Sequence, residues 1–310
     1  TYSIMPIVKK LVIAPFFLVV FSILIYSLNP LFSSYDLIFN LSLSTLIQLL
    51  TLSALILLSS LLFVLFVTLS SDWKLILPVG IVASLIPLAL VNPSLGLILT
   101  VGTLASLFLT YLTLESSLKS YLTFKPAAVL GPSIRHLSTL LVIILSVSFF
   151  LSINKIIQEK GFEIPDSLID TALELTSSSL PSDETEQVTL PQISPEQIEL
   201  LKKNPDLLKQ YGLDPKILDT LDKPANKTST KPNQELIKQA VKDQLQGVIK
   251  PYLGFVPVTL AVLLFITLES IVSFLTIFIY PLLWLIFYIL EKSGFIKFTT
   301  EMRPVKKMVV

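Results

Sequence analysis

Cysteine is absent from this sequence of 310 residues, and histidine occurs once, as His136. The lack of cysteine excludes disulfides, thiolate metal sites, a cysteine nucleophile and cysteine-linked lipids. A single histidine cannot supply the two histidines of an HExxH zinc site, and it leaves few ligands for any metal ion. The P-loop, GxGxxG and GxSxG patterns are absent as well. We therefore expect no catalytic residue, no cofactor and no metal, and the sequence favours a protein that is not an enzyme.

Charged residues are also scarce. They make up 15% of the chain, against roughly 25% in an average soluble protein. The net charge is +1. A chain so close to neutral has no overall field that would attract nucleic acid, so no nucleic-acid partner is expected.

Long apolar runs take the place of these residues, and the mean hydropathy is +0.78. Runs of about 20 apolar residues have the length that crosses a bilayer. They predict an all-α fold, a polytopic integral membrane helix bundle whose first partner is the lipid bilayer. The chain opens on Thr1 rather than Met, which indicates a fragment or a processed product. Residues 1–157 form a transmembrane region with five expected spans, at about 11–28, 45–69, 75–91, 95–114 and 136–157.

Prolines and small residues mark the third and fourth spans. The stretch 92–94, Asn-Pro-Ser, is a turn signal that predicts a tight hairpin between them. Pro78 and Pro87 lie inside the third span, and a membrane helix tolerates them because its neighbours satisfy the freed carbonyls. The fourth span holds small residues four apart, which predict helix-packing sites rather than a dimer face. These residues are Gly96, Thr100, Gly102 and Ser106.

Residues 158–250 differ in composition from the rest. The region has 16 acidic and 11 basic residues, and its aromatics are Phe162 and Tyr211. So few large apolar side chains cannot build a sizeable core, so we expect an extramembrane insert of short helices and partly disordered linkers. Short helices are expected at 165–175 and from Ser194 onward. A further helix at 234–250 has an apolar stripe that fits either packing on its own domain or a position along the membrane surface.

The run from Pro251 to Leu290 contains forty residues and one charge, Glu269. As one helix it would be about 60 Å long, twice the roughly 30 Å of hydrocarbon in a bilayer. The C-terminal transmembrane region, 251–298, therefore holds one or two spans, and the basic tail 299–310 follows it.

The two alternatives differ at Glu269. With one crossing, residues 258–280 span the bilayer, Pro281 ends the helix and residues 282–290 lie at the interface. With two crossings, Glu269 and Ser270 form a turn. No Gly, Asn or Pro supports such a turn, so we favour one crossing and six spans in total over seven.

Lysine and arginine near the ends of the spans set the expected orientation. The connections at 29–44 and 92–94 contain neither, whereas the segments expected on the opposite side are basic. The basic residues are Lys9 and Lys10, then Lys119, Lys125 and Arg135, and finally Lys292, Lys297, Arg303, Lys306 and Lys307. We expect a multi-pass protein of the cell (inner) membrane, with its N-terminus in the cytoplasm and the insert 158–250 on the outer side.

Glu269 is the candidate functional residue. With one crossing it falls at mid-membrane, where a charge costs at least about 2.5 kcal/mol and usually marks a function. A carboxyl there is expected to be neutral or paired, and it could bind an ion or pass a proton. No second acid lies inside a span, which argues against a proton or cation pathway. Gln48 and Asn154 are expected to be interhelical hydrogen-bonding or interfacial residues, and His136 an interface anchor.

The sequence favours a non-enzymatic membrane anchor or scaffold that presents the insert 158–250 to a protein partner. The alternative is a transporter or channel component that uses Glu269.

Overall fold

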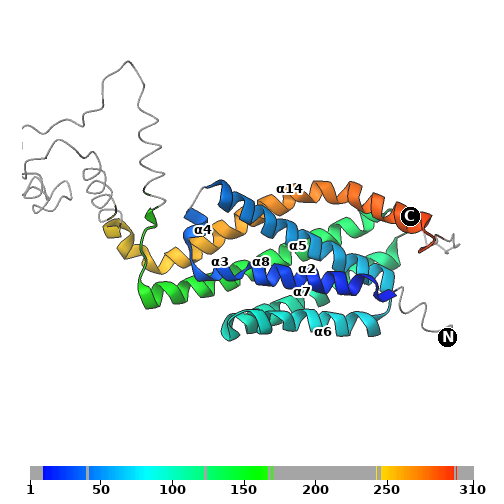
Figure 1. The fold of residues 1–310 in the computed structure, drawn as a ribbon, viewed down its shortest axis with the longest axis horizontal. Helices are drawn as coiled ribbons and strands as arrows, with labels where there is room; N and C mark the ends of the chain where they lie inside the picture. Colours follow the sequence, from blue (N-terminus) through cyan, green and yellow to red (C-terminus); the bar gives the residue numbers. More distant parts are fainter. Residues whose placement is uncertain are drawn as a thin grey trace, which may run out of the picture. The chain divides into compact units, whose positions relative to one another are not determined.

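The structure, a computed structural model, describes residues 10–39, 42–121, 124–166, 169, 242, 246–296 and 298. In these residues the regular structure is helical, without strands, and six helical segments are long and apolar enough to cross a membrane. The prediction of an all-α, polytopic bundle with six spans is therefore confirmed (Figure 1). The six segments are α2 (Ile13–Ser27) with α3 (Asn29–Ser33), α5 (Leu43–Ser70), α6 (Trp73–Leu90), α7 (Pro93–Ser120), α8 (Pro126–Lys160) and α14 (Val256–Lys292).

Two short elements complete the description. The helix α4 (Asp36–Phe39) connects α3 to α5, and the 3-10 helix η1 (Lys250–Phe255) leads into α14. The chain divides into two compact units, one of residues 1–161 and 255–310 and the other of residues 162–254. The first unit holds the six spans. The helices expected at 165–175, from Ser194 onward and at 234–250 lie largely outside the described residues.

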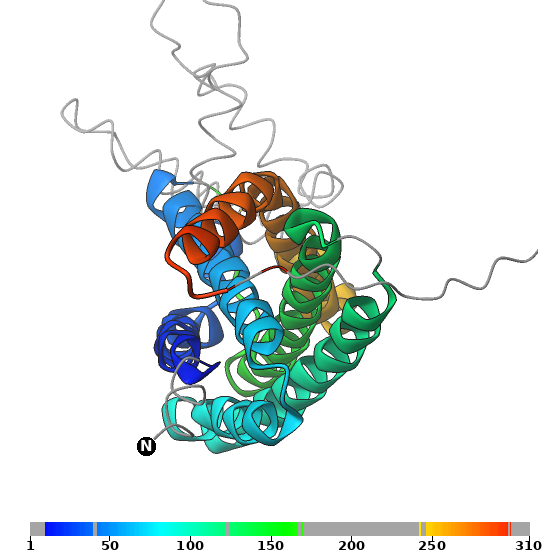
Figure 2. The same ribbon diagram turned by 90° about the vertical axis from the view of Figure 1, so that its right-hand side faces the viewer.

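The helix α5 occupies the centre of the bundle. It contacts α2, α8 and α14, and in the end-on view it lies among them (Figure 2). In the most apolar stretch of α5, 67% of the residues are buried, whereas the corresponding stretches of α6 and α14 are each 28% buried. The ring of Phe63 on α5 packs against that of Phe17 on α2 at a tilt, with ring centroids 5.3 Å apart. The apolar residues of α6 and α14 that remain exposed face outward, as expected for helices in contact with lipid.

Capping residues define the ends of α5 and the start of α6. The Ser42 hydroxyl accepts a hydrogen bond from the Thr45 amide, which fixes the start of α5. At the other end Ser71 adopts a left-handed conformation with φ of 49°. The Asp72 carboxylate then accepts the Lys74 amide at 3.1 Å and caps α6. Two residues thus reverse the chain between two membrane helices.

The tight hairpin expected at 92–94 is present. The helix α6 ends at Leu90, and α7 begins at Pro93. Amides in the first turn of a helix have no partner within the helix, so a proline, which lacks an amide hydrogen, fits there without loss. Pro78 and Pro87 both lie inside α6, which continues through them. The interior prolines therefore do not break this helix, as predicted for a membrane span.

The segment 115–135 is not a long polar loop. The helix α7 continues to Ser120, and α8 begins at Pro126 rather than at His136. An ion pair of 2.6 Å between Glu115 and Lys119, one turn apart, stabilises the end of α7. Arg135 and His136 therefore lie well inside α8 rather than at its start.

The C-terminal run forms one continuous helix. Glu269 and Ser270 lie within α14, so the turn of the seven-span alternative is absent. The expectation that Pro281 ends the helix is wrong, because α14 continues through it to Lys292. A proline removes one backbone hydrogen bond, and in an apolar environment the remaining carbonyls are best satisfied by continuing the helix.

Candidate functional site

The candidate residue Glu269 lies where α14 packs against α8. The Thr139 hydroxyl of α8 donates a hydrogen bond of 3.0 Å to Glu269 Oε1. One turn away, Arg135 Nη2 donates a long hydrogen bond of 3.5 Å to the Ser273 hydroxyl. Arg135 precedes Thr139 by four positions on α8, whereas Ser273 follows Glu269 by four positions on α14. The two helices therefore run antiparallel. The two polar pairs thus form adjacent steps along one helix contact.

The carboxyl group of Glu269 is only half satisfied. Its Oε2 atom is buried and has no hydrogen-bond partner among the described residues. No ion pair links Glu269 to Arg135 in the described part of the chain, although they lie one step apart along the contact. A buried oxygen without a donor is costly to stability, so Oε2 is the least satisfied atom of this contact.

The chemistry available at this contact is limited. Besides the carboxylate it offers the hydroxyls of Thr139 and Ser273 and the guanidinium of Arg135. Within the described residues there is no group of three His, Cys, Asp or Glu side chains that could hold a metal ion. The arrangement supplies hydrogen bonds between α8 and α14.

The other polar residues singled out in the sequence do not join Glu269. His136 is exposed on α8. Gln48 lines a separate cavity of about 610 Å³ beside Tyr26 and Asn29. The Asn154 side-chain oxygen accepts a hydrogen bond of 3.4 Å from Gln158 of the same helix, so this bond does not connect two helices.

The small residues of α7 face two different neighbours. A Cβ atom built on Gly96 would lie 3.0 Å from the Pro87 carbonyl oxygen of α6. One built on Gly102 would lie 2.8 Å from Cγ2 of Ile144, on α8. Ser106 is buried. The role of these three residues as packing sites remains a prediction, which substitution by alanine can test.

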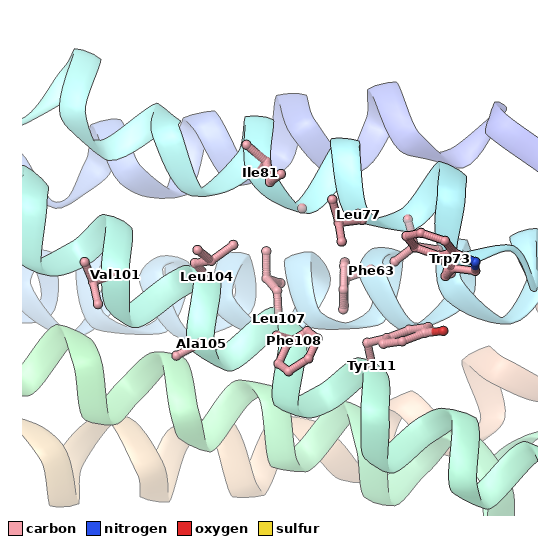
Figure 3. Close-up of a pocket in the computed structure, with 12 residues that line it drawn as sticks. Phe63, Trp73, Leu77, Ile81, Val101, Leu104, Ala105, Leu107, Phe108 and Tyr111 are labelled. Carbon is pink, nitrogen blue, oxygen red and sulfur yellow. The ribbon is translucent and has the colours of Figure 1, made fainter.

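A cavity that the sequence analysis missed lies between α6 and α7, with α5 behind it. Its volume is about 660 Å³, and its walls are apolar (Figure 3). Trp73 and Tyr111 stand at one end and Val101 at the other (Figure 3). The sequence signal that could have indicated it is Gly80, a small residue close to a helix-bending proline in α6.

The two ends of the insert are joined to each other within the second unit. The Lys242 ammonium forms an ion pair of 3.1 Å with Asp166. One turn further on, the Gln246 side chain donates a hydrogen bond of 3.2 Å to the Phe162 carbonyl oxygen. These four residues, which we call the neck, bring together positions far apart in sequence. The sequence analysis expected a helix with an apolar stripe at 234–250 but could not identify what its polar residues contact.

Comparisons add no functional assignment: no protein-family model, no curated protein and no solved structure matches the chain.

Proposed function

We propose that the protein is a non-enzymatic membrane anchor that presents the insert 158–250 to a protein partner outside the cytoplasm. The apolar helices make it an integral membrane protein. The observation that carries the proposal is the neck, which closes the insert at its base.

The neck supports presentation of the insert as one unit. Its ion pair involves a partly exposed Lys242 and an exposed Asp166, so its own contribution to stability is small, about 0–1 kcal/mol. The second contact, the hydrogen bond from Gln246 to Phe162, joins the same two segments of the insert one turn away. Phe162 and Ile164 are buried beside these polar groups. Two polar contacts and buried apolar side chains at one place favour a fixed base over two independent tethers.

The attachment points in the membrane unit support the same function. The insert follows α8 and precedes α14, and these two helices pack side by side along their length (Figure 1). Because they are antiparallel, the end of α8 and the beginning of α14 lie at the same end of the pair. The insert therefore leaves and re-enters the bundle at neighbouring points.

The proposed orientation has both chain ends in the cytoplasm. Six spans return the chain to the side on which it starts, and the start of α2 and the end of α14 lie at the same end of the bundle (Figure 1). The described lysines at that end are Lys10, Lys74, Lys119, Lys125 and Lys292, against Lys155, Lys160 and Lys250 at the other end, and the positive-inside rule favours the more basic end as the cytoplasmic one. A reporter that is active only in the cytoplasm, fused after Val310, should be active. Protease added outside intact cells should cut the insert.

Recovery of a partner tests the function itself. We would cross-link the full chain in its native membrane and identify the bound protein by mass spectrometry. Replacing residues 170–232 with a Gly/Ser linker keeps the neck and the six spans, and it should abolish recovery of that protein. Glu269→Gln is the matched control with an intact insert, and it should recover the partner as the unchanged chain does. Recovery of the same protein by the linker variant would refute the proposal.

The neck adds a graded test. Lys242→Glu places two negative charges together and should lower partner recovery. The double change Asp166→Lys/Lys242→Glu restores opposite charges, and it should regain most of the loss. Equal recovery by the single and double variants would mean that the neck has no part in presentation.

The unpartnered Oε2 of Glu269 favours a second candidate, a transporter or channel component. Proton or monovalent-cation flux into proteoliposomes would be measured with the full chain. Under this candidate Glu269→Gln should reduce flux at least about tenfold, because the amide cannot take up a proton. Flux that is unchanged in this variant would exclude the role.

A further inference from the structure

The cavity between α6 and α7 has the shape of a wedge. At the hairpin end the two helices touch, because a Cβ built on Gly96 would lie within 3.2 Å of backbone atoms of Pro87 and Leu88. Near the middle of α6 there is space beside the helix, since Gly80 lines the cavity and a Cβ built on it would meet no heavy atom within 4 Å. Phe63 of α5 forms part of the inner wall (Figure 3).

The length of the wedge matches one leaflet of a bilayer. Along α7 it extends from Val101 to Tyr111, which corresponds to about 15 Å at 1.5 Å per residue. This is half of the roughly 30 Å of hydrocarbon in a bilayer. The volume of about 660 Å³ is many times the roughly 30 Å³ that one water occupies in the liquid, so the cavity has room for an acyl chain.

The open side and the end of the wedge fit a lipid. Leu77, Leu104 and Phe108 line it and are exposed, so the cavity is continuous with the lipid-facing surface of the bundle. Trp73, 58% exposed, stands at the end next to Lys74. Aromatic residues of this kind lie at the level of the lipid headgroups.

Tyr111 completes this end of the cavity. Its hydroxyl lies near the carboxylate of Glu115, which is paired with Lys119 at 2.6 Å. The apolar walls thus end near charged residues: Lys74 follows Trp73 in the sequence, and Glu115 and Lys119 follow Tyr111 along α7.

We propose that this wedge binds one acyl chain of a membrane phospholipid as a resident ligand, with its headgroup beside Trp73 and Lys74. Bulk lipid touches a convex helix surface from one side. A chain in the wedge contacts three helices, so it exchanges more slowly than its neighbours and stays with the protein when the bilayer is removed.

Native mass spectrometry of the full chain tests the proposal. The protein would be released from nanodiscs of palmitoyl-oleoyl phosphatidylglycerol into detergent and its mass measured. One retained phospholipid per chain is expected. Gly80→Leu fills the wedge without a clash at Cβ, and it should reduce retention about tenfold, because several methylene groups lose their contacts.

Gly254→Leu is the matched control. Its added Cβ also meets no heavy atom within 4 Å, and Gly254 lies in η1 and does not line the wedge, so retention should not change. Ala105→Phe fills the wedge from α7, and it gives a second test if Gly80→Leu folds poorly. Retention that is absent from the unchanged chain, or equal in the filling and control variants, would overturn the proposal. A lipid-free dimer that Gly80→Leu dissociates would assign the wedge to a second copy of the chain instead.

Discussion

Thr139 on α8 donates a hydrogen bond of 3.0 Å to Oε1 of Glu269 on α14, while Oε2 of the same carboxyl is buried without a partner among the described residues. The two residues are 130 positions apart in the sequence. Their contact links the helices on either side of the insert. It also leaves one oxygen of the carboxyl unsatisfied, which is a feature that stability alone would not favour.

Thr139→Val removes the hydroxyl at nearly constant volume. Both oxygens of Glu269 then lack a donor, so we expect the free energy of unfolding to fall by about 1 kcal/mol, in the range found for hydrogen bonds between membrane helices. Unfolding by SDS in mixed micelles measures it. Thr267→Val is the control, because the Thr267 hydroxyl is bonded to Leu263 of its own helix at 2.8 Å. An equal loss in both variants would mean that the bond to Glu269 contributes nothing specific.

Replacing both partners separates stability from function. In Thr139→Val/Glu269→Leu neither polar group remains, and apolar pairs of similar size are often neutral or stabilising in place of buried polar ones. We expect the free energy of unfolding of this double variant to lie within about 0.5 kcal/mol of that of the unchanged protein, or to exceed it. The same SDS titration measures it. A loss larger than that of Thr139→Val alone would instead make Glu269 a structural residue.

The sequence was sufficient for the membrane fold because hydropathy is a local property. Each span is one long apolar run, and the described part of the chain has six of them. The ends of α7 and α8 were harder to predict. The charged residues between Glu115 and Arg135 lower the average hydropathy there, although an ion pair and an N-terminal proline make most of the segment helical. The expectation that Pro281 ends its helix was wrong because the effect of a proline on a helix depends on the surrounding solvent.

The site could be predicted only in part. A single acid in a long apolar run identifies Glu269 from the sequence alone. Thr139 has no such signal, because nothing in its neighbourhood indicates which of the many hydroxyls in the spans will meet that acid. The cavity next to Gly80 depends on the angle between α6 and α7, and that angle is a tertiary property.

Glycines on α6 and α7 should respond to alanine in a definite order. Gly80→Ala adds helix propensity, up to about 1 kcal/mol, and meets no atom within 4 Å, so stability should rise. Gly102→Ala places a Cβ 2.8 Å from the Ile144 side chain, which must move, so stability should fall. Gly96→Ala faces backbone atoms of Pro87 and Leu88, which cannot rotate away, so its loss should be the largest. Thermal unfolding in detergent ranks the three variants. A stabilising Gly96→Ala would contradict the close approach of the hairpin.

Ser152 provides a hydrogen bond that crosses between helices. Its buried hydroxyl donates to the Phe32 carbonyl oxygen of α3 at 2.7 Å, a carbonyl near the end of its helix with few other donors. Ser152→Ala should therefore lower the free energy of unfolding by about 1–2 kcal/mol, because the bond is lost and the carbonyl stays buried. Ser138→Ala is the matched control on the same helix. The Ser138 hydroxyl is also buried but bonds to the Ile134 carbonyl of α8 itself, which keeps its helical partner, so the loss should be below about 0.5 kcal/mol. Equal losses in the two variants would show that α3 is not held to α8 by this bond, and the start of the bundle would then depend on apolar packing alone.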